Sequence, residues 1–176
     1  MPKRKNNISG FTLVELLVVI AILGVLATIG LTAFTSSQAR GRDAERKSDL
    51  KQIASSLELY YSDYNKYPDS SSGKIVGCPS FTQTACVWGA SGSLSAFTDN
   101  KTIYFKALPK DPTANNTYYY QIVDTGKNQK FQLFAFLENS QDPSLMSNLS
   151  PICSGTSTKC NFAITSPNTT PTETPQ

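Results

Sequence analysis

The sequence predicts an α+β protein in which one long N-terminal α-helix packs against a small antiparallel β-sheet. Two observations predict the helix: residues 16–34 are 19 residues without a charge, and apolar residues then recur at steps of three and four as far as Tyr64. The sheet is predicted by residues 118–137, two aromatic and β-branched segments on either side of a turn. The 176 residues allow one membrane element and one modest core.

Residues 11–34 are expected to form a transmembrane helix. At about 1.5 Å per residue, the uncharged stretch measures about 28 Å, which is enough to cross a bilayer core. Basic residues precede this stretch, so we expect the N-terminus inside and the remainder outside. A conventional signal peptide is the alternative, but its apolar region would be shorter and free of carboxylates.

One carboxylate, Glu15, lies inside this apolar stretch. An ionised carboxylate in a membrane-spanning helix costs about 2.5–3.5 kcal/mol, so we expect it to have a partner or a function. The alternative is a glutamate at the membrane interface whose side chain reaches water.

Residues 35–64 are expected to continue the helix as an amphipathic segment. Its apolar stripe consists of Leu50, Ile53, Leu57, Tyr61 and Tyr64. The helix is expected to end at Asn65 and Pro68. Basic and acidic residues alternate over residues 40–51, which we interpret as a solvated face with local ion pairs. Binding of DNA or lipid headgroups by these residues is the alternative.

Residues 65–165 are expected to form a globular head. The segment 69–100 is rich in Ser, Gly, Thr and Asn and is predicted to be a loop. The hairpin at 118–137 follows; its second strand places Phe131, Leu133, Ala135 and Leu137 on one face, toward the apolar stripe of the helix. Residues 161–165 are predicted to add an edge strand. The Thr- and Pro-rich residues 166–176 are predicted to be disordered.

The four cysteines form two close pairs, which suggests disulfides in an exported chain. Three connectivities are possible. We favour Cys78–Cys86 and Cys153–Cys160, because the loops between them are short and rich in Gly, Ser and Thr. A zinc site is the alternative, but these spacings do not resemble tight zinc knuckles.

The composition argues against an enzyme. The chain has no histidine, the commonest general base and metal ligand, and it has no Gly-rich phosphate loop or convincing carboxylate pair. The net charge of +3 comes from Lys3, Arg4 and Lys5, since the other 13 basic residues balance 13 acidic ones. Without the leader the chain is neutral, which argues against a general nucleic-acid binder.

The junction of the basic leader and the apolar stretch reads Gly10-Phe11-Thr12-Leu13-Val14-Glu15. This arrangement resembles the class III signal of type IV pilins and type II secretion pseudopilins. The segment Tyr61–Pro68, the segment Leu108–Pro112 and the hairpin extend the resemblance more weakly. The resemblance implies the pilin fold and a structural subunit.

The resemblance also implies a maturation reaction. A prepilin peptidase would cleave between Gly10 and Phe11, remove residues 1–10 and methylate the new amine of Phe11. Glu15, with Thr12 and Leu13, would then act in assembly, where its carboxylate neutralises the Phe11 amine of an adjacent subunit. Gly24 and Gly30 are expected to give the helix local flexibility.

The expected partners are other copies of the chain, the prepilin peptidase, an inner-membrane assembly platform, a cytoplasmic assembly ATPase and the membrane; a host surface or DNA could be bound by the filament. The precursor is expected to cross the cytoplasmic membrane once, and the mature chain to join a surface filament. Two observations favour a type IV pilus subunit for adhesion, motility or DNA uptake. The chain has two cysteine pairs, and the pseudopilin element Asp-Pro-Trp-Gly is replaced by Asp111-Pro112-Thr113-Ala114. The alternatives are a type II secretion pseudopilin and a membrane-anchored adhesive module that does not polymerise.

Some major pseudopilins bind calcium after the hairpin. Glu138, Asn139, Gln141 and Asp142 offer oxygen ligands in the corresponding region of this chain and form a weak calcium candidate. Short polar loops commonly have such a composition, and no other cofactor is expected.

Overall fold

The computed structural model describes residues 10–78, 84–90, 96–99 and 101–176, without the side chains of residues 29, 30, 32 and 33. Of the predicted leader, only Gly10 lies within the described residues. The chain divides into two compact units, Met1–Gln38 and Ala39–Gln176.

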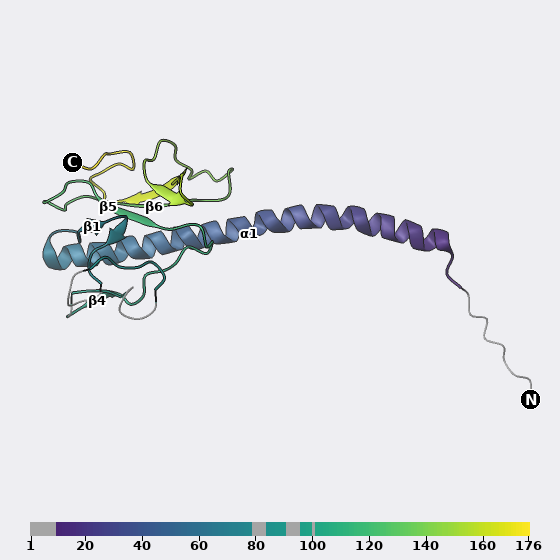
Figure 1. Ribbon diagram of the computed structural model, residues 1–176, viewed down its shortest axis with the longest axis horizontal. Helices are drawn as coiled ribbons and strands as arrows, with labels where there is room; N and C mark the ends of the chain where they lie inside the picture. The colour runs from purple at the N-terminus through teal and green to yellow at the C-terminus, as the bar shows by residue number, and fades with distance from the viewer. Residues whose placement is uncertain (1–9, 79–83, 91–95, 100) are drawn as a thin grey trace, which may run out of the picture. The chain divides into compact units, whose positions relative to one another are not determined.

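One helix, α1, runs over Leu13–Tyr64 (Figure 1). It begins two residues later than expected, because Thr12 caps it. The Thr12 backbone N–H and hydroxyl donate to Glu15 Oε2 at 2.9 and 2.8 Å, and the Glu15 N–H donates to Thr12 Oγ1 at 3.2 Å. This reciprocal pattern is a capping box.

The helix ends at Tyr64, as predicted. Asn65 follows in the left-handed region with φ 53°, and its N–H donates to the Tyr61 carbonyl oxygen at 2.7 Å. Asparagine tolerates this conformation better than most residues, and it closes the last turn of the helix.

In the unit Met1–Gln38, the described apolar side chains of α1 are exposed, including Leu13 at 86 % and Val25 at 62 %. Among the described residues, no helix has the length and apolar character needed to cross a membrane. The membrane span over residues 11–34 stays a prediction.

The unit Ala39–Gln176 contains, in its described part, four small antiparallel sheets. Their strands are β1 (Ser70–Ser71), β2 (Lys74–Ile75), β3 (Phe97–Thr98), β4 (Ile103–Phe105), β5 (Tyr119–Ile122), β6 (Phe131–Ala135), β7 (Ile152–Ser154), β8 (Thr158–Lys159) and β9 (Phe162–Thr165). The three-stranded sheet has the order β5-β6-β9, and the others are the pairs β1-β2, β3-β4 and β7-β8. The long α1 and these small sheets confirm the predicted α+β, pilin-like fold.

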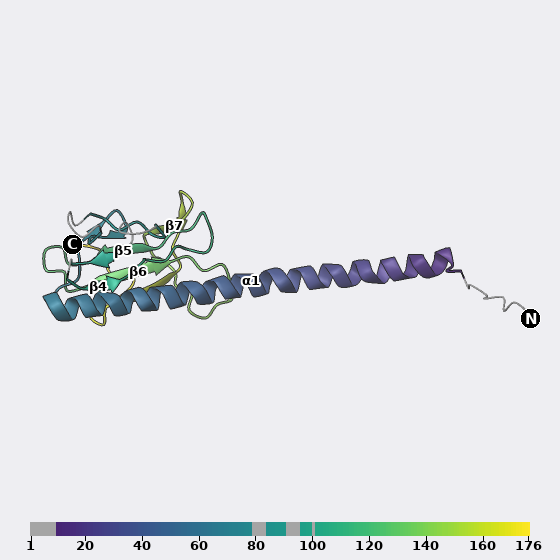
Figure 2. The ribbon, with the colours of Figure 1, turned by 90° about the horizontal axis from the view of Figure 1, so that it is seen from below.

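The hairpin of β5 and β6 is confirmed, with Tyr120 opposite Leu133. In its turn, the Asp124 carboxylate accepts the backbone N–H groups of Gln129 and Lys130, and Gly126 has φ 90°. The predicted edge strand is confirmed as β9, which pairs with β6. β5 and β6 run alongside the C-terminal part of α1 in both views (Figure 1, Figure 2).

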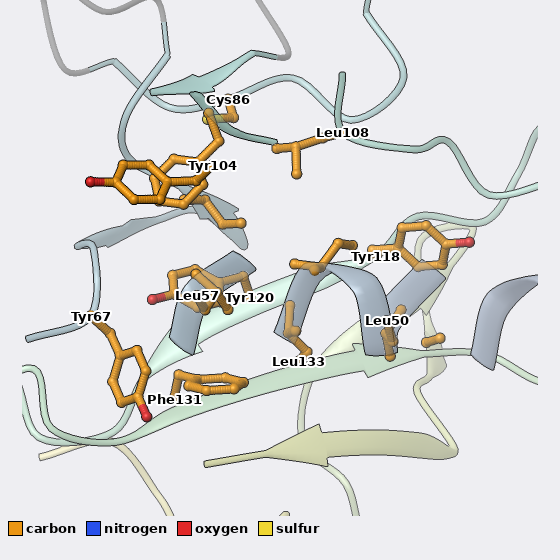
Figure 3. Packing of buried hydrophobic residues seen from close by; sticks show 14 of the residues in the cluster. Leu50, Leu57, Tyr67, Cys86, Tyr104, Leu108, Tyr118, Tyr120, Phe131 and Leu133 are labelled. Atoms are coloured by element: carbon orange, nitrogen blue, oxygen red, sulfur yellow. The ribbon is translucent and has the colours of Figure 1, made fainter. Parts of the chain in front are cut away.

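The main core lies between α1 and this sheet. Leu50, Ile53 and Leu57 of the predicted stripe are completely buried. They belong to one cluster with all four predicted inward residues of the second strand, Phe131, Leu133, Ala135 and Leu137. Figure 3 shows Leu50 and Leu57 gathered with Tyr120, Phe131 and Leu133.

A second, smaller core covers the other face of β6. Phe134 is completely buried there with Leu149 and the Cys153–Cys160 disulfide. β6 therefore has apolar cover on both faces, which explains why all five of its residues are buried.

Two predictions for the unit Ala39–Gln176 are wrong, one for residues 69–100 and one for the tail 166–176. Residues 69–100 are not only loop, because they contain the short strands β1, β2 and β3.

Residues 166–176 are not disordered. The buried amide of Gln132 donates to the carbonyl oxygens of Thr170 and Glu173 at 2.5 and 3.0 Å. Lys130 forms an ion pair with the Glu173 carboxylate at 2.7 Å. The Gln176 N–H donates to the Val123 carbonyl oxygen. A buried amide requires hydrogen-bond acceptors, and the tail supplies them.

Leu57 and Leu59 provide a matched pair of core and surface substitutions. Leu57 is completely buried and Leu59 is 50 % exposed. We expect Leu57→Ala to lower the free energy of unfolding by about 2–5 kcal/mol, because it leaves a cavity beneath the sheet. Leu59→Ala should change it by less than about 0.5 kcal/mol. Chemical denaturation measures the free energy of unfolding of both variants. An equal decrease in the two variants would contradict the assigned core.

Candidate functional site

The predicted cleavage site lies just before α1. Gly10 and Phe11 are exposed and precede the helix, and a Cβ at Gly10 would meet no described atom within 4 Å. Phe11 is 77 % exposed. Among the described residues, nothing covers the bond between them.

The residues predicted to act in assembly lie in the first turn of the helix. Leu13 is exposed, whereas Thr12 and Glu15 bond to each other in the capping box. Sequence reasoning missed this cap, although the Thr-x-x-Glu spacing signals it. Glu15 thus has a local structural role, and its role in assembly stays a prediction.

Gly24 and Gly30 lie within α1, which continues through both without interruption. A Cβ at Gly24 would meet nothing within 4 Å among the described atoms. Nothing in the described chain therefore requires glycine at this position, and flexibility at Gly24 and Gly30 remains a proposal.

The amphipathic part of α1 carries a buried ion network that the sequence did not predict. Arg46 is completely buried and donates to Asp43 at 2.7 Å, to both oxygens of Asp111 at 2.8 and 2.9 Å, and to Thr113 at 2.8 Å. Its Nη2 also lies 2.7 Å from Glu138 Oε1. The expectation of a solvated face is wrong here, because the chain folds over this part of the helix.

The charge of Arg46 is stabilised by these partners. Burial by itself lowers the pKa of Arg46, but the hydrogen bonds to Asp111 and Glu138 outweigh it and raise the pKa above its ordinary value. Such a buried group is stable only when its partners are complete, and removal of one partner costs about 3–5 kcal/mol.

The segment after the hairpin is held to α1 by the same charges. The Asp43 carboxylate accepts the backbone N–H groups of Glu138 and Asn139 at 2.9 and 2.8 Å. Arg42 donates through Nε to Glu138 at 2.9 Å, and Nη2 forms an ion pair with it. Hydrogen bonding from Arg42, with help from Arg46, lowers the pKa of Glu138 to about 2 against the opposing effect of burial.

Two of the calcium candidates, Glu138 and Asp142, are engaged with these cations. Glu138 pairs with Arg42 and Arg46. Lys47 Nζ lies 2.7 Å from both oxygens of Asp142 and 3.2 Å from Ser144 Oγ, and this ammonium lowers the pKa of Asp142. Within the described residues, no three acidic, cysteine or histidine side chains gather as a metal site. The arrangement therefore does not favour calcium at Glu138, Asn139 and Asp142.

Both predicted disulfides are confirmed. Cys78 bonds Cys86, and Cys153 bonds Cys160. The second bridge closes the β7-β8 hairpin and contributes to the core over β6. The alternative of a zinc site at these cysteines is excluded by the bonding.

Comparison with known proteins agrees with this geometry. The family model described as the prokaryotic N-terminal methylation motif matches residues 5–31. The type II secretion system core protein G of Pseudomonas aeruginosa is 33 % identical over 132 residues, which cover 75 % of this chain and 84 % of that protein. The chain belongs to the type IV pilin and pseudopilin family.

Further relatives support the same assignment. The core protein G of Aeromonas hydrophila is 31 % identical over 137 residues, covering 77 % of this chain and 85 % of that protein. The type IV major pilin protein PilA of Myxococcus xanthus is 40 % identical over 60 residues, covering 34 % and 27 %. No solved structure matches significantly. Members of this family are structural subunits, so the chain is not an enzyme.

The ionised state of Glu138 predicts a pH dependence. Because its pKa is lowered from 4.5 to about 2 in the folded chain, its contribution to stability is present above pH 4.5 and lost as the pH falls toward 2. We expect Glu138→Gln to lose less free energy of unfolding over this range than the parent. Glu45→Gln, which changes an exposed carboxylate on α1, is the control. Parallel curves for Glu138→Gln and the parent, measured by denaturation at each pH, would contradict the assignment.

The ion pairs at Glu138 and Asp142 predict insensitivity to calcium. We expect excess calcium or a chelator to move the thermal midpoint by less than about 1 °C, because both carboxylates already have cationic partners. A calcium ion present at a hundred times its Kd would add about 2.7 kcal/mol. A rise of about 5 °C on addition of calcium to chelator-treated protein would therefore contradict the prediction.

Proposed function

We propose that this chain is a pseudopilin, a structural subunit that is processed at Gly10/Phe11, methylated at Phe11 and polymerised into the filament of a type II secretion apparatus. The observation that carries this proposal is the similarity to core protein G, which extends over about three quarters of the chain and into the head. The similarity to the pilin PilA covers only 60 residues. The comparisons thus favour the pseudopilin over the pilus subunit that the cysteine pairs suggested.

The precursor is anchored in the cytoplasmic membrane in this proposal. The methylation motif and the exposure of the described apolar side chains between residues 11 and 34 support it. So large an apolar surface requires a cover of lipid or of other protein. Before assembly the cover is the bilayer, and in the filament it is the same helix of other copies.

Glu15 guides assembly by its charge. In the described chain its hydrogen bonds come only from Thr12, which is neutral. The carboxylate therefore has no cationic partner there, whereas the Phe11 amine released from an adjacent copy would supply one. In an apolar bundle, a copy docked out of register leaves both charges unpaired, which disfavours that register.

Processing and assembly in this proposal require the prepilin peptidase, the inner-membrane platform and the cytoplasmic ATPase. A type IV pilus subunit is the second candidate, supported by the similarity of the N-terminal part to PilA. The phenotype of a strain that lacks the gene distinguishes the pseudopilin from the pilus subunit. Loss of secreted proteins with normal surface filaments supports the pseudopilin, and loss of surface filaments with normal secretion supports the pilin.

The mature N-terminus tests the processing step. We expect the intact mass of chain purified from its native membrane to correspond to residues 11–176 plus one methyl group. Gly10→Phe should leave residues 1–10 attached, because a bulky side chain obstructs a close-fitting cleft. Gly24→Ala, at a site where a Cβ meets nothing, should be processed normally. Removal of the leader from Gly10→Phe would contradict this site.

Two substitutions of Glu15 separate its charge from its capping role. Glutamine retains the capping box but has no charge, whereas alanine removes both. We expect Glu15→Gln and Glu15→Ala both to insert in the membrane and both to fail in filament formation, measured by electron microscopy and by sedimentation of sheared filaments. Thr12→Ser, which retains the cap, is the control. Normal filament yield from Glu15→Gln would show that the residue acts as a cap only.

A further inference from the structure

A cavity of about 140 Å³ lies where α1 ends and the head begins its first loop. Three tyrosines line it together with two acidic side chains and one lysine: Tyr60, Tyr64, Tyr67, Asp69, Asp99 and Lys66. All of them belong to the unit Ala39–Gln176. The assembly residues at the start of α1 are not part of this cavity.

The size of the cavity limits what it can hold. An apolar cavity of about 150 Å³ accommodates one benzene molecule, whereas drug-sized ligands require about 300 Å³ or more. The cavity therefore suits one small planar group on the end of a chain.

The aromatic lining is held in place by its own contacts. The rings of Tyr60 and Tyr64 stack with centroids 4.6 Å apart, and the Tyr60 ring packs on Tyr104 at 5.1 Å. Tyr67 is 3 % exposed, and its hydroxyl donates to Glu58 at 3.0 Å. The faces of tyrosine rings attract cations.

Asp99 supplies a fixed negative charge. Its carboxylate accepts the Tyr64 hydroxyl and the backbone N–H groups of Thr102 and Lys101, at 2.6 and 2.9 Å. These hydrogen bonds, chiefly that of Tyr64, hold the pKa of Asp99 well below its usual range. The carboxylate is ionised at neutral pH but has little capacity left to accept further hydrogen bonds.

Asp69, an exposed residue, supplies the complementary feature, an acceptor oxygen that no described residue occupies. Its Oδ1 accepts the Asn128 amide at 2.5 Å, while Oδ2 accepts no hydrogen bond from any described residue. Against these two carboxylates the lining offers one cation, the exposed Lys66. The lining thus has a net negative charge, an open acceptor and the partly exposed ring of Tyr64.

We propose that this cavity binds a guanidinium group, such as that of an arginine side chain presented by another polypeptide. A guanidinium is planar and stacks on tyrosine rings, and its fork of N–H donors can bond the open oxygen of Asp69. An ammonium is more strongly hydrated and does not stack, and a neutral group gains nothing from Asp99. The site is distinct from the N-terminal assembly residues and does not depend on whether the filament is a pilus or a pseudopilus.

The test uses the full chain in detergent micelles with isotope-labelled tyrosines. Titration with N-acetyl-arginine amide should shift the ring signals of Tyr60, Tyr64 and Tyr67 saturably. The neutral isostere N-acetyl-citrulline amide should give no saturable shift, and N-acetyl-lysine amide should bind at least about threefold more weakly. Equal binding of the citrulline compound, or no saturable shift with the arginine compound, would overturn the proposal.

Three variants locate the binding in the cavity. Asp69→Asn keeps an acceptor for Asn128 but removes the charge, and it should weaken the affinity about fivefold or more. Lys66→Gln removes the competing cation and should strengthen it. Glu45→Gln removes one negative charge from an exposed position of the same unit and should have no effect. Unchanged affinity in Asp69→Asn, with the ring signals of Tyr119 and Tyr120 in β5 intact, would refute the site. Weaker binding by Lys66→Gln would also refute it.

Discussion

The head depends on one buried cation, the guanidinium of Arg46. It reaches from α1 to Asp111 and Thr113 in one segment and to Glu138 in another, so that two stretches far apart in the sequence meet at one point of the helix. Apolar contacts hold β6 against Leu50 and Leu57, but they are not directional. The hydrogen bonds of Arg46 add direction, because a guanidinium leaves its partners unpaired unless they lie at the ends of its fork.

The same use of internal cations holds the segment after the hairpin against α1. Arg42 and Lys47 neutralise Glu138 and Asp142, and Asp43 accepts the backbone N–H groups that begin the segment. A helix that carries both signs of charge on the side facing the head can thus fix an acidic loop by itself. The composition of this loop suggests calcium, whereas its partners on α1 supply the positive charge.

The two ends of α1 have different tasks. At the first turn, Glu15 is part of a capping box and has no cationic partner among the described residues, which suits the role proposed for it in assembly. At the last turn, tyrosines and carboxylates surround the cavity proposed to bind a guanidinium. A filament subunit with such an arrangement would join copies through one end and present a selective surface through the head.

The sequence by itself determined the helix, most of its apolar stripe, the hairpin and the family, because periodicity, turn residues and the Gly-Phe-x-x-x-Glu motif are local signals. For the cysteines it favoured the two local pairings but left three connectivities open, and the structure decided between them. The Thr12–Glu15 cap was equally visible but was missed. Only the tertiary structure decided the burial of Arg46, since Asp111 is 65 residues away from it and no local pattern connects the two. The same holds for the tail, whose Thr- and Pro-rich composition indicates disorder. Its order comes from the buried Gln132, which needs acceptors that only the folded chain brings to it.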